Sequence, residues 1–241
     1  MIEVSQSGQV VTITLAAPER RNALRIADMQ ALGDALNQAD NDPNVRVCIL
    51  TGQGKVFSAG ADFGELTAGE RPDIPLAELS ARIEAMRLPV VAGLNGAVMG
   101  AAVDIAAACD LRVAVTGARL AIPAAMIGVH YPGASIARIE RSFGPAVAKR
   151  LLLAAETFTL PDPALGGWVT ACTDAESFGQ TVRELGCKVA SLAPLSVSGM
   201  KRSVNDRDDA AARVTACAES ADHAEALSAR KEKRTAQFQG Q

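Results

Sequence analysis

The chain has 241 residues, of which 49% are hydrophobic but only 3% aromatic, and it carries a formal net charge of −3. A chain of this length buries about 70–75% of its unfolded surface, which is enough for one sizeable core. The charge leaves no basic excess for a nucleic-acid backbone, and the uncharged stretch Leu88–Val103 is too short and too interrupted by proline and glycine to span a bilayer.

In the N-terminal half, runs rich in β-branched residues alternate with segments of helical periodicity. In chain order we expect a strand at 10–15, a helix capped by Asn22 and ending before Asp40, a strand at 45–50, a glycine-bearing loop, a helix at 76–87, a strand at 90–94, a helix at 101–108 and a strand at 111–115. This alternation with short connections indicates an α/β architecture.

From about Ser191 the composition becomes almost wholly helical. The stretch Asp208–Arg234 is rich in Ala, Glu, Arg and Lys and contains neither Gly nor Pro, so it predicts one long C-terminal helix. We therefore divide the chain into a core at 1–190 and a C-terminal helical region at 191–241. No internal repeat is detectable by letter identity.

The cysteines and histidines show no metal-binding spacing. None of the five cysteines lies within four residues of another, and the two histidines are His130 and His223. The odd cysteine count and an N-terminus without a signal-peptide pattern are typical of reduced thiols in a cytosol. We therefore expect a cytoplasmic protein that holds no metal ion.

The most informative stretch is Asn95–Asp110 (NGAVMGAAVDIAAACD). From Ala97 to Ala108, Asp104 is the only residue that is neither apolar nor glycine, and a helix that is apolar all round is buried. A lone buried carboxylate is costly, so Asp104 should be hydrogen-bonded, have a raised pKa or face a cavity. Two interpretations stay open: Asp104 is a general acid or base, or it ties down a neighbouring loop by accepting backbone amides.

Two turns of small residues could present free backbone amides. Met99-Gly100-Ala101 leads into the apolar helix, whose first amides have no internal partner and carry partial positive charge. The other turn, Ser58–Leu66 (SAGADFGEL), follows the strand expected at 45–50. Two amides that converge on one oxygen form an oxyanion hole, which supplies about 3–4 kcal/mol per donor. Each turn taken alone is typical of an ordinary loop.

Four segments in order resemble the crotonase (enoyl-CoA hydratase/isomerase) superfamily: Ala17–Leu24 (APERRNAL), Val45–Phe63, Leu88–Ala114 and Arg230–Gly240. Their order and separations are family-like over essentially the whole chain. The resemblance implies a crotonase-like α/β core of repeated ββα turns and a C-terminal helical region that builds a homotrimer or a dimer of trimers. It also implies an acyl-CoA thioester as the small-molecule substrate, with no other cofactor.

The resemblance further implies which residues form the site. The amides of Ala61 and Ala101 would make the oxyanion hole, with Asp104 as the catalytic carboxylate. The residues implied to contact the acyl-CoA are Arg21, Ala23, Ala59, Ala61, Asp62, Phe63, Gly64, Ala101, Tyr131 and Lys233. Lys233 would reach coenzyme A, often that of an adjacent subunit, although a basic run near a helix end is also typical of a solvated surface.

Two positions depart from the familiar hydratases of this family, which use two glutamates around a water. Asp104 keeps the first carboxylate but is one methylene shorter. Ala124 stands where the second glutamate would be, and the loss of one acid/base group costs roughly 10²–10⁴ in rate. His130 and Tyr131 follow closely, and either could serve as a proton donor. Alternatively, Tyr131 packs in the pocket wall and His130 lies at the surface.

These departures leave two functions open. The first, which we favour, is an enzyme of fatty-acid metabolism in which Asp104 moves a proton on a thioester enolate, giving hydration of a 2-enoyl-CoA or migration of its double bond. The second is a non-catalytic or weakly catalytic protein that holds or delivers fatty acyl-CoA, because Ala124 supplies no carboxylate. A decarboxylase that uses Tyr131 ranks third.

Overall fold

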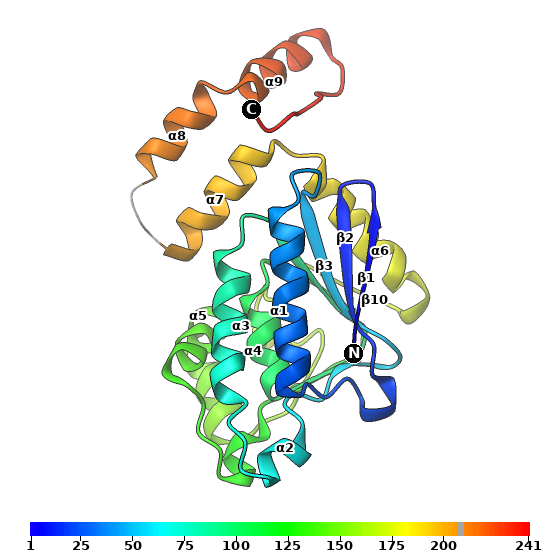
Figure 1. Cartoon of the computed structure of the whole chain (residues 1–241), viewed down its shortest axis with the longest axis vertical. Coiled ribbons are helices and arrows are strands. Elements are labelled where there is room, and N and C mark those ends of the chain that lie inside the picture. Colours follow the sequence, from blue (N-terminus) through cyan, green and yellow to red (C-terminus); the bar gives the residue numbers. More distant parts are fainter. Residues whose placement is uncertain (207–209) are drawn as a thin grey trace.

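A unit of two strands followed by a helix recurs along the chain (Figure 1). The computed structural model describes residues 1–206 and 210–241. The units are β1 (Ile2–Ser7), β2 (Val10–Leu15) and α1 (Ile26–Asn41); β3 (Val47–Gly52), β4 (Val56–Ser58) and α3 (Asp73–Ala85); β5 (Val90–Leu94), β6 (Ala97–Met99) and α4 (Ala101–Ala108); and β7 (Leu111–Val115), β8 (Arg119–Ala121) and α5 (Gly133–Leu153). The repeated ββα architecture implied by the resemblance is therefore confirmed.

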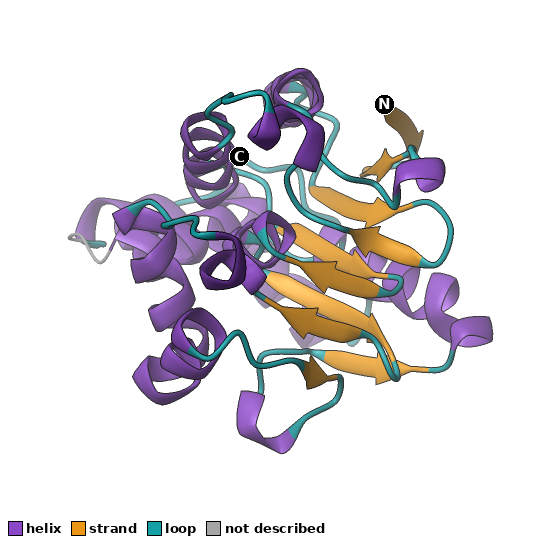
Figure 2. Ribbon diagram, turned by 90° about the horizontal axis from the view of Figure 1, so that it is seen from below, coloured by secondary structure: helices purple, strands orange, loops and turns teal. Residues whose placement is uncertain are grey.

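From the second unit onward, the two strands of a unit enter different sheets. The six-stranded sheet has the order β1-β2-β3-β5-β7-β10, and the four-stranded sheet has the order β4-β6-β8-β9, with β9 at Phe158–Thr159 and β10 at Ala171–Thr173. In the larger sheet β2, β3, β5, β7 and β10 run parallel, and β1 is antiparallel to β2. Figure 2 shows the strands stacked in the middle of the molecule with helices on both sides.

Strand β3 shows how both faces of the larger sheet are covered. Val47 and Ile49 lie in the same apolar cluster as residues of α6 (Ala175–Ala190), whereas Cys48 and Leu50 belong to the main core with residues of α1 and α3. Parallel strands are usually buried on both faces. This double burial explains why the strand is a continuous apolar run with no polar alternation.

Asn22 does not cap the first helix, as the sequence led us to expect. Helix α1 begins at Ile26 and runs to Asn41, while Asn22 is buried with a φ of 54°. Its side-chain oxygen accepts from the Ala17 amide at 2.9 Å, and its Nδ2 donates to the Val56 carbonyl at 2.8 Å. An amide side chain both donates and accepts, so Asn22 joins two loops instead of starting a helix.

The expected single helix over Asp208–Arg234 is wrong for the described residues. After α7 (Pro194–Asp206) the structure has α8 (Ala211–Ala218) and α9 (Ala221–Glu232), separated at Ser220. The Ser220 side chain accepts from the His223 amide at 3.0 Å and so starts α9 as its N-cap. Asp208, where the expected helix began, lies outside the described residues. The division of the chain at residue 190 stays a prediction.

Candidate active site

Two loops from neighbouring units touch main chain to main chain. One follows β4 and contains Gly60, and the other is the turn at Gly100, between Met99 at the end of β6 and Ala101 at the start of α4. Gly60 has a φ of 92°, and a Cβ there would lie 2.6 Å from the Met99 carbonyl oxygen and 3.1 Å from the Ala101 nitrogen. Because no side chain fits in that gap, glycine lets the two loops approach closely.

This approach brings two unpaired backbone amides to one cavity of about 460 Å³. Ala61 and Ala101 both line the cavity, and in the part of the chain that the structure describes neither amide donates to a protein acceptor. Ala101 is the first residue of α4, so its amide also lies at the positive end of a helix. The pair can donate to one oxygen atom that carries negative charge.

The Gly60 loop is held by the segment before α1. The Leu24 amide donates to the Gly60 carbonyl at 2.7 Å, and the Asp62 amide donates to the Leu24 carbonyl at 2.9 Å. The Ala59 amide donates to the Arg21 carbonyl at 2.9 Å. These bonds on either side of Ala61 fix the loop and leave the amide of Ala61 itself unpaired.

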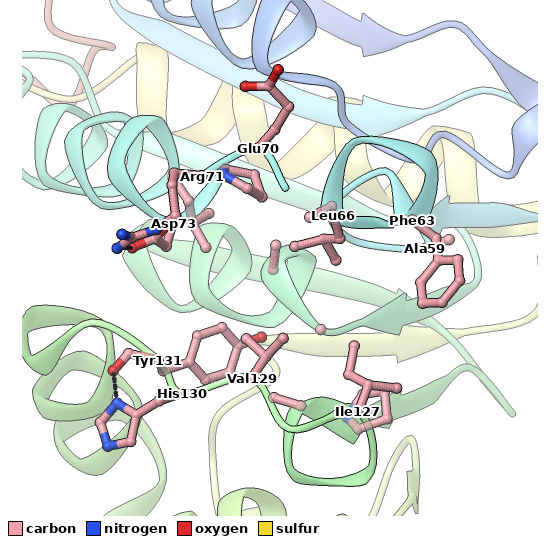
Figure 3. A pocket seen from close by; sticks show the side chains of 17 residues that line it. Ala59, Phe63, Leu66, Glu70, Arg71, Asp73, Ile127, Val129, His130 and Tyr131 are labelled. Carbon is pink, nitrogen blue, oxygen red and sulfur yellow. Dashed lines mark hydrogen bonds and ion pairs between the residues drawn. The ribbon is translucent and has the colours of Figure 1, made fainter. Parts of the chain in front are cut away.

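Tyr131 contributes a hydroxyl group to a cavity wall that is otherwise mainly apolar. Its ring lies between the labelled cavity residues in Figure 3, with the hydroxyl directed toward the centre of the view. The hydroxyl oxygen lies 3.8 Å from where a Cβ on Gly100 would be, and it has no hydrogen-bond partner among residues 1–206 and 210–241. Burial, with the nearby Asp104 carboxylate as the smaller cause, raises the pKa of Tyr131. The phenol therefore stays protonated and can donate.

Charged and polar side chains gather at one side of the cavity. Arg71 forms a bidentate pair with Asp73, with bonds of 2.7 and 2.8 Å, and Figure 3 places this pair on the same side as His130. The His130 Nδ1 donates to the Tyr131 carbonyl at 2.7 Å. Glu70 also lines the cavity, but its carboxylate points away from Tyr131 and His130 in this view.

Asp104 is completely buried and lies behind the cavity wall. It is 0% exposed and is not a cavity-lining residue. One carboxylate oxygen accepts from Arg138 at 2.7 Å, and the other accepts from Ser135 at 2.8 Å and Ser80 at 3.0 Å. These donors are side chains, whereas our structural interpretation from the sequence had assumed backbone amides.

Arg138 extends this cluster to a second carboxylate, and the sequence analysis did not identify it. Its other terminal nitrogen donates to Glu84 at 2.9 Å, and Glu84 also accepts from Arg141 at 2.6 Å. Arg138 follows Ser135 by three residues and precedes the buried Ile139. A cation on the apolar face of an amphipathic helix was the available signal that a buried anion lay opposite.

The structure brings half of the implied site residues together. Ala59, Ala61, Phe63, Ala101 and Tyr131 line one cavity. The cavity lining also includes Ala124, the residue that the resemblance aligns with the second glutamate of the familiar hydratases.

The remaining implied residues do not line the cavity. Arg21, Ala23, Asp62 and Gly64 belong to the two paired segments beside it, and the Asp62 side chain caps α2 (Phe63–Thr67) by accepting from the Glu65 amide at 3.2 Å. Lys233 ends α9, and α9 lies at the opposite end of the molecule from α2 (Figure 1). A role for Lys233 at an adjacent subunit stays a prediction.

The thiols form no disulfide, and two of them, Cys48 and Cys109, are buried. All five cysteines are free, and burial raises the pKa of Cys109 to about 12. Within residues 1–206 and 210–241, no group of three or more His, Cys, Asp or Glu side chains is placed to hold a metal ion. In the same residues, no helix is both long and apolar enough to cross a membrane.

Comparison with known proteins agrees with the fold and the motifs. The family model for enoyl-CoA hydratase/isomerase matches residues 5–241. The probable enoyl-CoA hydratase echA6 of Mycobacterium bovis is 35% identical, with 100% of each chain covered. Among solved structures, an enoyl-CoA hydratase/carnithine racemase from Magnetospirillum magneticum has a TM-score of 0.92 at 26% identity, covering 100% of this chain and 96% of that chain. An enoyl-CoA hydratase from Bacillus anthracis has a TM-score of 0.90 at 28% identity, covering 100% and 99%.

The match extends over nearly the whole length in sequence and over the whole length in structure. It includes both loops that carry the unpaired amides and the helix that carries Asp104. The chain therefore belongs to the enoyl-CoA hydratase/isomerase family, the crotonase superfamily that its four sequence segments predict.

Proposed function

We propose that this protein binds acyl-CoA thioesters in the cavity and polarises the thioester carbonyl between the amides of Ala61 and Ala101, while adding water to a double bond slowly or not at all. One observation carries the proposal: the two unpaired amides share a cavity whose lining includes the Ala124 methyl group but not the Asp104 carboxylate. Membership of the enoyl-CoA hydratase/isomerase family supports acyl-CoA as the ligand.

The two amides suit a carbonyl oxygen that gains negative charge. Each preorganised donor in such a hole supplies about 3–4 kcal/mol of stabilisation, and the N-terminus of α4 adds a favourable field at Ala101. Arg21 and the Asp62–Gly64 segment flank the same end as Ala59 and Phe63, so we assign the coenzyme A portion to that end. The acyl chain would lie against the apolar wall that includes Leu66 and Leu76.

The surroundings of the amides argue against efficient hydration. Addition of water by this family's route needs two carboxylates, and Ala124 replaces one of them with a methyl group. Asp104 retains the other, but all three of its close hydrogen bonds are to protein donors and its side chain does not line the cavity. To act as a base, Asp104 would have to leave the buried guanidinium of Arg138, which is expensive.

Tyr131 favours a second candidate function, proton transfer on the bound thioester. Its hydroxyl is unpartnered among the described residues and protonated, and it faces the same cavity as the two amides. A phenol in this place can return a proton to an enolate, as isomerisation or decarboxylation requires.

Binding and turnover of the same ligands separate these candidates. We expect calorimetry to show that the wild type binds both acyl-CoAs with a saturated chain and 2-enoyl-CoAs, and that the binding reaches a plateau. Hydration of crotonyl-CoA at saturating substrate should be slow and equally slow in Asp104→Asn. Rapid hydration that Asp104→Asn abolishes would overturn the proposal. Residual turnover that Tyr131→Phe removes without weakening binding would support the second candidate.

A further inference from the structure

We propose that Arg138 is a positioning residue for the oxyanion site: by holding Asp104, it fixes the rotation of α4 and hence the direction of the Ala101 amide. This inference rests on the proposed function, because it concerns one of the two amides assigned to the thioester. Arg138 does not line the cavity, so it acts through Asp104 and not on the ligand.

Helix α4 has few other directional contacts: the Gly100 amide before it donates to the Ala121 carbonyl at 2.8 Å, and Arg112 donates to the Ala106 carbonyl at 3.0 Å near its C-terminal end. Its sequence is AAVDIAAA, and every one of its residues is buried. Alanine side chains are small and nearly alike from every direction, and apolar burial is non-directional. The two larger apolar side chains, Val103 and Ile105, pack in the main core but supply no side-chain hydrogen bond that would hold the Ala101 amide toward the cavity.

Asp104 is the only residue of α4 with polar side-chain atoms, and its contacts are directional. It lies three residues after Ala101, in the same helical turn. Its oxygens are bonded to Ser80 on α3 and to Ser135 and Arg138 on α5. Helix α4 is therefore attached on two sides by short hydrogen bonds, in surroundings where their electrostatic strength is greatest.

Arg138 determines whether burying the Asp104 carboxylate is energetically favourable or costly. Its side chain is 3% exposed, and its two terminal nitrogens bridge Asp104 on α4 and Glu84 on α3. Removing Arg138 would leave the buried Asp104 carboxylate without its counter-ion, a strongly unfavourable state. Removing the Asp104 charge instead leaves Arg138 paired with Glu84, which is a milder change.

We therefore expect the affinity for acyl-CoA to fall in a defined order among the variants. Arg138→Met should weaken acyl-CoA binding by about tenfold or more, and Asp104→Asn should weaken it less. The double variant Asp104→Asn/Arg138→Met should bind within about threefold of the wild type, because an Asn amide can both donate to and accept from the two serine hydroxyls. Arg141→Met is the matched control: Arg141 lies on the same helix and pairs with the same Glu84, but its side chain is 51% exposed, so this variant should behave as the wild type.

The decisive readout is the infrared stretching frequency of the bound thioester carbonyl, since a loss of global stability alone would leave it unchanged. We expect a downshift on binding to the wild type, a smaller downshift in Arg138→Met and recovery in the double variant. Should Arg138→Met fail to fold, Arg138→Lys, which cannot bridge both carboxylates, should show the smaller downshift. An unchanged downshift in the Arg138 variants, or no recovery in the double variant, would overturn this inference alone. No binding by the wild type would instead overturn the proposed function.

Discussion

The backbone nitrogen of Ala101 is the smallest part of the molecule on which the proposed function depends. It is the first nitrogen of α4, it has no protein acceptor among the described residues, and it lies where the Gly60 loop meets the helix. Its effect on a ligand comes from its direction and not from its side chain. A substitution that removes the N–H therefore tests it directly.

Ala101→Pro removes that donor at a helix position where proline is tolerated, because the first helical residue needs no internal hydrogen bond. We expect the variant to fold and to lose most of the carbonyl downshift, corresponding to about 3–4 kcal/mol of lost stabilisation of an oxyanion. Ala101→Gly keeps the amide and is the control. An Ala101→Pro protein with the full downshift would contradict the assignment of this amide.

At the residue scale, the Ala101 amide was implied by the family resemblance, because a turn of small residues is by itself typical of an ordinary loop. From the polar residue inside the apolar helix, the sequence indicated a carboxylate needing a partner. It could not show that the partner is Arg138, 34 residues further on. The cation on the apolar face of α5 signals a buried anion opposite, but tertiary packing decides which carboxylate it meets.

At the scale of elements, two carboxylates of α9 hydrogen-bond to the segment that follows the helix at the end of the chain. Asp222 accepts from the amides of Gln239 and Gly240 at 2.6 and 2.9 Å. Glu225 is bonded to Arg234 and accepts from the Gln237 amide at 2.8 Å. The segment that follows α9 therefore folds back along the helix.

The Glu225 interactions predict a pH dependence. Hydrogen bonding to Arg234, followed by the Gln237 amide, lowers the pKa of Glu225 from 4.5 to about 2. A depressed carboxyl pKa gives stability that is fully present above the unfolded value and is lost as pH falls through the folded one. Hydrogen exchange at the Gln237 amide should therefore be slower in wild type than in Glu225→Gln at pH 6, and the difference should vanish toward pH 2. An equal exchange rate at pH 6 would contradict the interaction.

The element boundaries show where sequence patterns were sufficient. The strands at 10–15, 90–94 and 111–115 and the helix at 101–108 agree with β2, β5, β7 and α4, because mainly apolar runs with Gly, Pro or Asp close to their ends leave little choice. The pattern did not give the first strand, Ile2–Ser7, whose residues are mostly exposed. It also missed Ser220, where one capping hydroxyl was enough to end an otherwise continuous helical composition.

For the whole molecule, Lys201 attaches α7 to the body. This lysine is 8% exposed. Its Nζ donates to the Leu88 carbonyl at 2.8 Å and the Ile83 carbonyl at 3.0 Å, and it pairs with Asp110 at 2.8 Å. Burial raises the pKa of Asp110, so the carboxylate depends on the ammonium group to stay charged. One side chain from the C-terminal helices thus satisfies three acceptors of the core.

Lys201→Met should lower the free energy of unfolding by about 3–5 kcal/mol, because it removes the counter-ion of Asp110, which keeps only the Val90 amide as donor at 2.7 Å, and the donor to two carbonyls. Denaturant unfolding followed by circular dichroism measures this change. The double variant Lys201→Met/Asp110→Asn should recover part of the loss, since no buried charge then remains. Arg202→Met, next in the chain and exposed, should change stability little.

The contact at Gly60 also limits how closely the second and third ββα units can lie. A similar contact occurs at Gly96, where a Cβ would lie only 2.0 Å from the Lys55 carbonyl oxygen. At both points the backbone of one unit meets the backbone of the next with no room for a side chain between them. Even a single methyl group at either position would have to push the two units apart, because the atoms that it meets are main-chain atoms that cannot turn aside.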